Sequence, residues 1–173
     1  MLYNMARVIS ITNQKGGVGK TTTSINLAAS LVKRGKRILL IDMDPQGNST
    51  VGCGIEVGDV ESTIYDLLLL ESTAQQAIIK SDCGVDLITA NGDLAGAQIE
   101  LLNEIGRELR LQKALVPIQD DYDYIFIDCP PALNVLTINA LVASDSVMIP
   151  MQCEYFALEG LSALISTVRK IRE

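Results

Sequence analysis

The glycine-rich segment KGGVGKTT, residues 15–22, constrains the fold of this chain more than any other stretch. It follows the β-branched run Val8–Thr12 and leads into Thr22–Arg34, where apolar residues recur at helical spacing. Glycines let backbone N–H groups curl into a concave anion site, and the amino end of a helix adds partial positive charge. This order of elements predicts a phosphate-binding loop; the alternative is a glycine-rich turn that carries a surface lysine.

Seven consecutive residues of this loop are candidates to bind a nucleotide: Gly16, Gly17, Val18, Gly19, Lys20, Thr21 and Thr22. We expect the amine of Lys20 to reach the β- and γ-phosphates and to take part in catalysis. We expect the hydroxyl of Thr21 to bind Mg²⁺. The loop departs from the common pattern, because Gln14 stands where the first glycine is usual and a second lysine, Lys15, follows it.

Four further β-rich runs alternate with helical patterns along the chain. The runs are 37–41, 85–89, 124–127 and 146–149, and the later helical candidates are 63–70, 94–103, 106–116, 134–143 and 157–172. The runs are almost continuously Val, Ile or Leu, as strands buried on both faces are. The pattern predicts an α/β, doubly wound fold, with a mostly parallel sheet and helices on both faces.

Carboxylates stand where two of these strands end. Asp42 and Asp44 follow the second run, and Asp128 follows the fourth. In such folds ligands bind beyond the carboxyl ends of the strands. We assign Asp128 and Asp42 to Mg²⁺ and Asp44 to the attacking water. The alternative for the first pair is a helix cap and a turn aspartate before Pro45.

The composition excludes several classes of site. The chain has no histidine, so imidazole-based catalysis and imidazole metal sites are absent. Its net charge of −7 gives no overall basic footprint for nucleic acid. None of the four cysteines, Cys53, Cys83, Cys129 and Cys153, forms a C-x-x-C pair, and we expect reduced thiols in a cytosolic protein.

Four ordered motifs carry a resemblance to a known family. They are KGGVGKTT with its extra lysine, LLIDMDPQGNST, YDYIFIDCPPALNVLTINAL and VMIPMQCEYFALEGL. Together they resemble the ParA/Soj chromosome- and plasmid-partition ATPases. These belong to the deviant Walker A group of P-loop NTPases, which also includes MinD. The resemblance extends from about Arg7 to the last residue.

The resemblance implies an ATP-binding and hydrolysing dimerisation switch for segregating DNA, slow without its partner, with ATP and Mg²⁺ as cofactors. It makes Lys15 the signature lysine, which crosses to the phosphates of the other subunit in an ATP-dependent homodimer. It also implies a partner protein of the ParB type and a cytoplasmic protein that associates with the nucleoid in its full-length form.

Members of this family usually continue past the length of this chain. We therefore expect residues 1–173 to form a single ATPase domain that lacks the family's C-terminal portion. By the same resemblance, that portion supplies most of the adenine pocket and the surface for non-specific DNA.

Other functions remain open at this point. A MinD-like, membrane-associated division-site ATPase needs an amphipathic membrane helix. Residues 157–172 offer a leucine-rich face that a helix docked on the sheet explains equally well, so we expect no stable membrane association. A P-loop ATP-dependent ligase with a small carboxylate substrate is a second alternative. A fragment that only binds a partner is a third.

Overall fold

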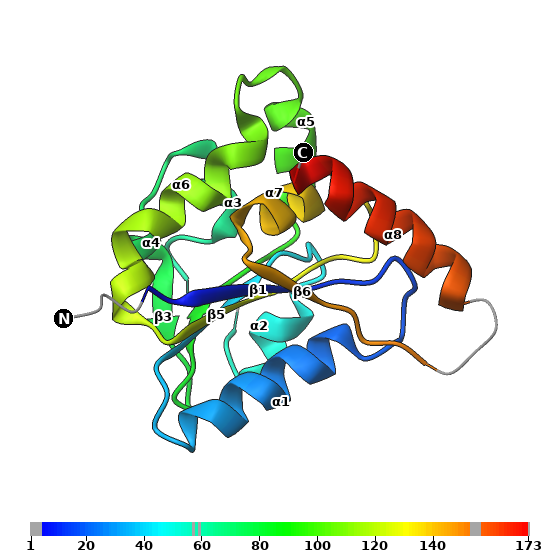
Figure 1. Ribbon diagram of the computed structural model, residues 1–173. Coiled ribbons are helices and arrows are strands. Elements are labelled where there is room, and N and C mark those ends of the chain that lie inside the picture. Colours follow the sequence, from blue (N-terminus) through cyan, green and yellow to red (C-terminus); the bar gives the residue numbers. More distant parts are fainter. Residues whose placement is uncertain (1–4, 57, 59, 153–156, 173) are drawn as a thin grey trace.

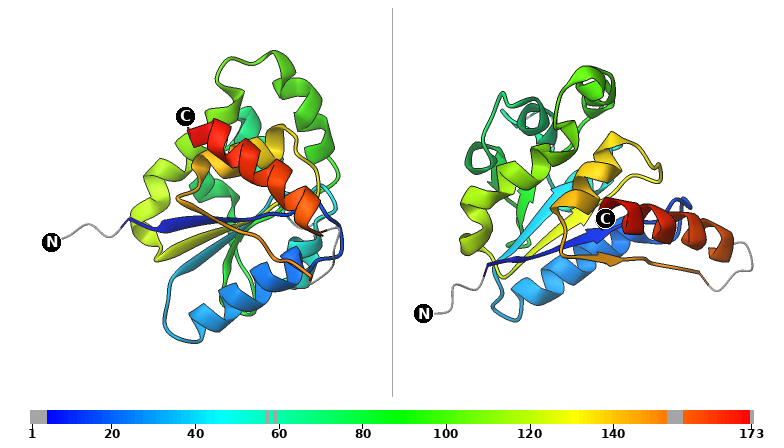
Figure 2. Two further views of the ribbon diagram at one scale, coloured as in Figure 1. Left: turned by 45° about the vertical axis from the view of Figure 1, so that its right-hand side comes forward. Right: turned by 45° about the horizontal axis from the view of Figure 1, so that its top comes forward.

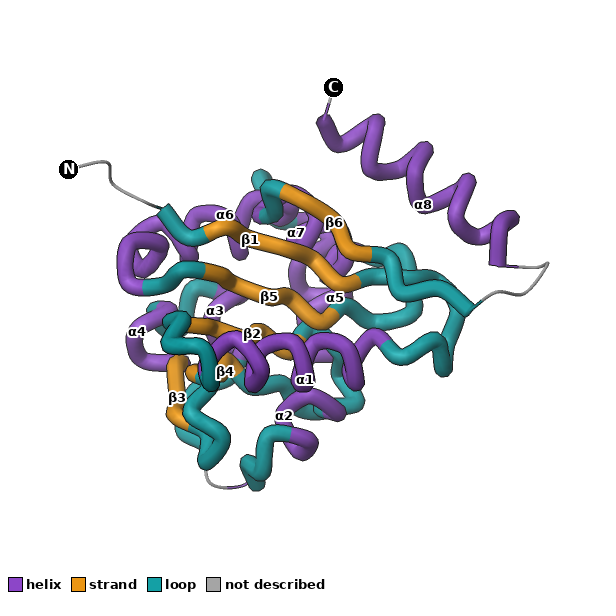
Figure 3. The backbone as a smooth tube through the Cα atoms, turned by 60° about the horizontal axis from the view of Figure 1, so that its bottom comes forward, coloured by secondary structure: helices purple, strands orange, loops and turns teal. Residues whose placement is uncertain are grey.

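A single twisted sheet organises the computed structural model, which describes residues 5–56, 58, 60–152 and 157–172. Its strand order is β3-β4-β2-β5-β1-β6, and every described pairing except that of β3 with β4 is parallel. Figure 3 shows the order across the sheet. The bounds are β1 (Arg7–Ile11), β2 (Ile38–Asp42), β3 (Ile78–Lys80), β4 (Asp86–Ile88), β5 (Tyr124–Asp128) and β6 (Ser146–Met148). The predicted doubly wound, mostly parallel sheet is confirmed.

Helices cover both faces of this sheet (Figures 1 and 2). One face carries α1 (Lys20–Val32) and the short α2 (Asn48–Gly52). The other carries α3 (Ile64–Leu69), α4 (Ala74–Ala77), α5 (Leu94–Glu100), α6 (Arg110–Leu115) and α7 (Val135–Ala143), with 3-10 turns at Leu101–Asn103, Arg107–Leu109 and Val116–Asp121. The last helix, α8 (Ala157–Arg172), packs against α7.

The alternation of side chains along the central strands explains why their sequences are continuously apolar. Leu39 and Ile41 of β2 point into the core under α3–α7, whereas Leu40 points into the core under α1. In β5, Ile125 and Phe126 divide between the two faces in the same way. Because both faces are covered, the interior positions of both strands are apolar, and their buried carboxylates, Asp42 and Asp128, stand at the carboxyl ends.

The sequence patterns predicted the main strands but missed three short elements, β3, α2 and α4. The five predicted strands are present, each end within one residue of its expected place. The strand β3 was not predicted, and it pairs antiparallel with β4 across a turn at residues 81–84. Nor were α2 and α4, because elements of three to five residues are too short to display a period.

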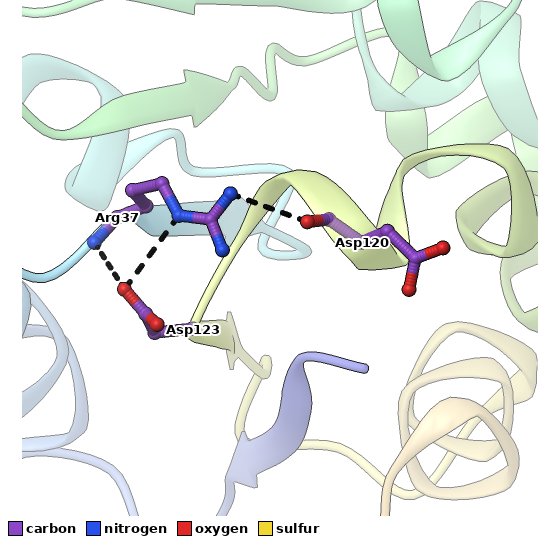
Figure 4. A network of polar contacts seen from close by, with 3 residues as sticks. All are labelled: Arg37, Asp120 and Asp123. Carbon is purple, nitrogen blue, oxygen red and sulfur yellow. Dashed lines mark hydrogen bonds and ion pairs between the residues drawn. The ribbon is translucent and has the colours of Figure 1, made fainter. Parts of the chain in front are cut away.

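At the amino ends of the strands, Arg37 joins β2 to β5 (Figure 4). Its backbone N–H donates to Oδ2 of Asp123 at 2.8 Å, and its guanidinium donates to the carbonyl oxygen of Asp120 at 3.2 Å. The guanidinium of Arg37 also forms an ion pair with Oδ2 of Asp123 at 3.7 Å, and a pair as exposed as this one contributes at most about 1 kcal/mol to stability. These contacts hold the amino ends of β2 and β5 together, at the side of the sheet opposite to the carboxyl ends of the strands.

Candidate functional site

The loop between β1 and α1 has the conformation that an anion site requires. Gly19 caps α1 in the left-handed region, with φ of 88°, which a residue with a side chain adopts only under strain. A Cβ built on Gly16, Gly17 or Gly19 would meet no atom within 4 Å, so this stretch of backbone faces open space. Asn13 anchors the loop, because its amide accepts from the N–H of Lys15 and donates to the carbonyl of Pro150.

A cavity of about 500 Å³ opens in front of this loop. The segments that follow β1, β2 and β5 all contribute to its wall, which is formed by Gly16, Gly17, Gly19, Lys20, Thr21, Thr22, Asp44, Gln46, Asn48 and Pro131. Its size lies within the range of small-molecule sites. The fold therefore brings together strand ends that are far apart in the sequence.

The ammonium group of Lys20 lies inside the loop rather than in solvent. It donates to the carbonyl oxygen of Lys15 at 3.3 Å, and the residue is only 8% exposed. A cation held at the amino end of α1 adds to the partial positive charge of that helix end and makes it attractive to phosphate.

Asp128, at the end of β5, gathers three hydroxyl groups around a buried carboxylate. It accepts from Oγ1 of Thr21 at 2.7 Å, from Oγ of Ser49 at 2.7 Å and from Oγ of Ser24 at 3.2 Å. Burial raises the pKa of Asp128, and the three hydroxyl groups and the charge of Lys20 oppose that rise. The carboxylate thus stays beside Thr21 at a cost in desolvation that its hydrogen bonds only partly offset.

Asp42 and Asp44 occupy different positions, although they are only two residues apart. Asp44 is half-buried, lines the cavity and accepts from the N–H of Gln46. Asp42 is fully buried behind it, where one oxygen accepts from the N–H and the hydroxyl of Thr50 and the other accepts from the N–H of Asp44. Burial raises the pKa of Asp42 to about 6.

Four predicted residues are not among the described residues that line the cavity: the buried carboxylates Asp42 and Asp128, and the loop residues Lys15 and Val18. Lys15 is half-buried and Val18 is buried. Lys15 contributes through its backbone, which Asn13 and Lys20 both contact. Cys153 lies outside the described residues, as do two other residues of the fourth motif, Glu154 and Tyr155.

Sequence reasoning missed the hydroxyl residues that hold the carboxylates. Ser49 and Thr50 begin α2 and bond to Asp128 and Asp42, and Ser24 bonds to Asp128 from α1. For Ser49 and Thr50, the sequence feature that could have indicated this role was the run NST directly after Gly47. It is a cluster of hydroxyl and amide side chains after a glycine turn.

The last helix is the part of the chain on which a membrane role would depend. Leu164 of α8 is buried and Ile165 is 39% exposed. Within the described residues, no helix combines the length and the apolar character that crossing a bilayer requires.

Comparisons with known proteins place these features in a family. A family described as "AAA domain" matches residues 6–173. The chain is 58% identical over 171 residues to the sporulation initiation inhibitor protein Soj of Bacillus subtilis, a match that covers 98% of this chain and 67% of Soj. It is 52% identical over 170 residues to the chromosome partitioning protein ParA of Myxococcus xanthus, a match that covers 98% of this chain and 60% of ParA.

A solved structure agrees with the fold. The crystal structure of cobyrinic acid a,c-diamide synthase from Mycobacterium smegmatis, with bound ATP analog and magnesium, superposes with a TM-score of 0.92 at 41% identity. The match covers 96% of this chain and 68% of that one. This chain thus spans about two thirds of the length of the proteins it matches.

Proposed function

Since this chain belongs to the family of the ParA and Soj partition ATPases, we propose that it binds ATP with Mg²⁺ and hydrolyses it slowly. In this proposal the bound nucleotide drives the pairing of two copies, and pairing serves the segregation of chromosomal or plasmid DNA. The chromosome partitioning protein ParA of M. xanthus supports the partition role by its name, and the M. smegmatis structure supports the cofactors by its bound ATP analog and magnesium.

One observation carries the nucleotide proposal. The cavity lies at the amino end of α1, with the ammonium of Lys20 inside the loop and the hydroxyl of Thr21 bonded to a buried carboxylate. Positive charge for phosphates and an oxygen ligand for a metal ion thus occur side by side. No other described cavity at the carboxyl ends of the strands combines these groups.

The residues around the cavity fit a Mg²⁺–nucleotide. The backbone of Gly16–Gly19, the amine of Lys20 and the hydroxyl of Thr22 are proposed to receive the phosphates. Thr21 donates its hydrogen to Asp128, which leaves the oxygen lone pairs of Thr21 available to a cation. A bound Mg²⁺ would neutralise phosphate charge, and its own charge would offset the desolvation that Asp128 and Asp42 bear.

Asp44 is proposed to orient the attacking water and to accept its proton, because it alone among Asp42, Asp44 and Asp128 lines the cavity. With a single carboxylate in that role, turnover is expected to be slow without a partner. The amine of Lys15 is proposed to serve the phosphates of the other subunit. The support for that step is the family's signature lysine, with the backbone of Lys15 held firmly by Asn13.

The partners are proposals that rest on the family. A protein of the ParB type is proposed as the partner that accelerates turnover, and non-specific DNA as the surface on which the paired form acts. Neither is assigned to described residues of this chain, because the chain spans only 67% of the length of Soj and 60% of the length of ParA.

The experiment for this proposal is sedimentation velocity combined with phosphate release. The chain is expected to sediment as a larger species with Mg²⁺ and a non-hydrolysable ATP analog than with ADP, and to release phosphate slowly from ATP. A chain that binds the analog tightly but keeps the same sedimentation coefficient would contradict the dimerisation switch, while leaving nucleotide binding intact.

The 41% identity to a cobyrinic acid a,c-diamide synthase favours one second candidate, a P-loop ATP-dependent ligase. In a ligase, ATP turnover depends on a small carboxylate substrate. Phosphate release that stays unchanged across a panel of such carboxylates would remove this candidate. Release that begins only when a carboxylate is added would favour it over the switch.

A further inference from the structure

Two cysteines, Cys53 and Cys83, lie on adjacent segments on the α1 side of the sheet, away from the cavity. We propose that Cys83 is an oxidation site and that Cys53 converts its oxidised form into an intramolecular disulfide. The bond would join the end of α2 to the turn between β3 and β4. This inference is independent of the proposed nucleotide chemistry.

The backbone brings the two segments together. Cys53 follows α2, and its N–H donates to the carbonyl oxygens of Ser49 and Thr50. A Cβ built on the next residue, Gly54, would lie 4.0 Å from Oδ2 of Asp82, the neighbour of Cys83. Residues that are about thirty positions apart in the chain are therefore adjacent in space.

The two thiols differ in exposure. Cys53 is 5% exposed and packs with Val85 in the core under α1, whereas Cys83 is exposed on the turn. The sulfur of Cys83 lies 3.1 Å from Oγ of Ser81, whose hydroxyl also bonds to the carbonyl of Val85. The β3–β4 turn thus holds Cys83 at the surface, next in the chain to Asp82, which lies beside Gly54.

The electrostatics agree with this adjacency of the two segments. Burial, followed by the charge of Cys83 and a hydrogen bond with its thiol, raises the pKa of Cys53 to about 12. Together with the approach of Gly54 to Asp82, this agrees with two cysteines that lie on adjacent segments. Among the described residues, no three Cys, Asp or Glu side chains form a group that could hold a metal ion, so thiol chemistry suits the pair better than a metal.

The chemistry is thiol–disulfide exchange with a small disulfide such as oxidised glutathione. The thiolate of Cys83 attacks one sulfur of the small disulfide, whose S–S bond breaks and releases one small thiolate. The thiolate of Cys53 then attacks Sγ of Cys83, and the second small thiolate leaves. The two cysteines lose two electrons and two protons, and the small disulfide is reduced to two thiols. Cys83 reacts first because it is exposed, while Cys53 carries a raised pKa.

The bond would act on the segment that holds the buried carboxylates. The first turn of α2 carries Ser49 and Thr50, which bond to Asp128 and Asp42. A disulfide at the other end of the same short helix would tie it to the β3–β4 turn. Oxidation is therefore expected to restrain α2 and to raise the unfolding temperature by about 5–10 °C.

Peptide mapping tests the proposal directly. The folded, reduced chain is incubated with a glutathione redox buffer, quenched with acid, alkylated and digested with trypsin without reductant. Trypsin cleaves after Lys80, so Cys53 falls in residues 38–80 and Cys83 in residues 81–107, and neither peptide contains another cysteine. The expected product is these two peptides joined, lighter by roughly 2 Da than their sum and separated by dithiothreitol.

Three variants sharpen the result. Cys83→Ser is expected to remove the linked peptides and the rise in unfolding temperature. Cys53→Ala is expected to leave glutathione trapped on Cys83. The control Cys153→Ser is expected to keep the link. If the wild-type chain carries glutathione on Cys83 with Cys53 still alkylatable, or if Cys83 links to another cysteine, the proposal is overturned. Because Cys83 is exposed, Cys83→Ser decides the matter even if Cys53→Ala does not fold.

Discussion

Replacing Asp42 with asparagine should make the nucleotide-free chain more stable near neutral pH, and the gain should depend on pH. Burial raises the pKa of Asp42 from 3.8 to about 6. One pKa unit corresponds to about 1.4 kcal/mol, so keeping this carboxylate ionised in the folded chain costs about 3 kcal/mol. Below pH 3.8 the carboxyl group is protonated and the folded wild-type chain does not bear this cost. The free energy of unfolding therefore falls as the pH rises from 3.8 towards 6 and the cost is incurred.

The asparagine side chain would not titrate, so the difference in stability between Asp42→Asn and wild type should grow with pH. Of the total, about 1.3 kcal/mol should develop between pH 5 and pH 7. The asparagine oxygen can still accept from Thr50, while its amide faces the N–H of Asp44 and forfeits about 1 kcal/mol at every pH. The variant should accordingly be more stable than wild type by about 2 kcal/mol at pH 7.

Urea unfolding at pH 5, 6 and 7 measures this difference. Asp82→Asn is the matched control, because it removes one negative charge from an exposed position on the β3–β4 turn. A difference between Asp42→Asn and wild type that stays constant with pH, or shrinks as the pH rises, would refute the argument from burial. With Mg²⁺ and ATP present, the pH dependence of the wild-type chain should flatten, because a cation near Asp42 favours its ionised form.

Three further changes test separate parts of the account. Asp44→Ala should keep ATP binding and the nucleotide-dependent larger species but lose phosphate release, and release at the wild-type rate would exclude Asp44 as the catalytic group. Lys15→Gln should still bind nucleotide through Lys20 and the loop backbone, yet sediment as the smaller species with the ATP analog; a normal larger species would mean that Lys15 does not serve a partner. Gly47→Ala should lower the free energy of unfolding by about 1–3 kcal/mol, because φ is 63° there and the new Cβ would lie 2.9 Å from the carbonyl oxygen of Ala90. The control Gly92→Ala meets open space and should change stability by less than about 0.5 kcal/mol in a chemical unfolding series.

Local sequence predicted the central sheet because burial on both faces forces a visible pattern. Strands such as Ile38–Asp42 must be apolar at every core position, and the glycines before α1 are required by backbone conformation rather than by distant contacts. Both signals lie within a few residues. The cavity wall followed from them, because parallel strands end at a common edge.

The hydroxyl residues that hydrogen-bond to the buried carboxylates could not be predicted, because their contacts join separate segments of the chain. Ser49 bonds to Asp128 across 79 positions of sequence, and Thr50 reaches Asp42 only because α2 turns back after Gly47. A five-residue helix has no period to read, and a buried hydroxyl is recognised only by its partner. For the same reason, the sequence did not predict that Cys53 and Cys83 lie on adjacent segments. Their proximity depends on the antiparallel strand β3, which was not predicted.

Calorimetric titration of the chain with Mg²⁺–ATP tests the central claim most directly, which is that the loop before α1 is a Mg²⁺–nucleotide site. Lys20→Ala should weaken the binding by about 10–100-fold, because it removes a charged hydrogen-bond donor from the phosphates. Lys33→Ala, an exposed lysine beyond the end of α1, should leave the affinity unchanged. Equal affinity of the wild-type chain and Lys20→Ala, or an affinity indifferent to Mg²⁺, would contradict the assignment of this cavity.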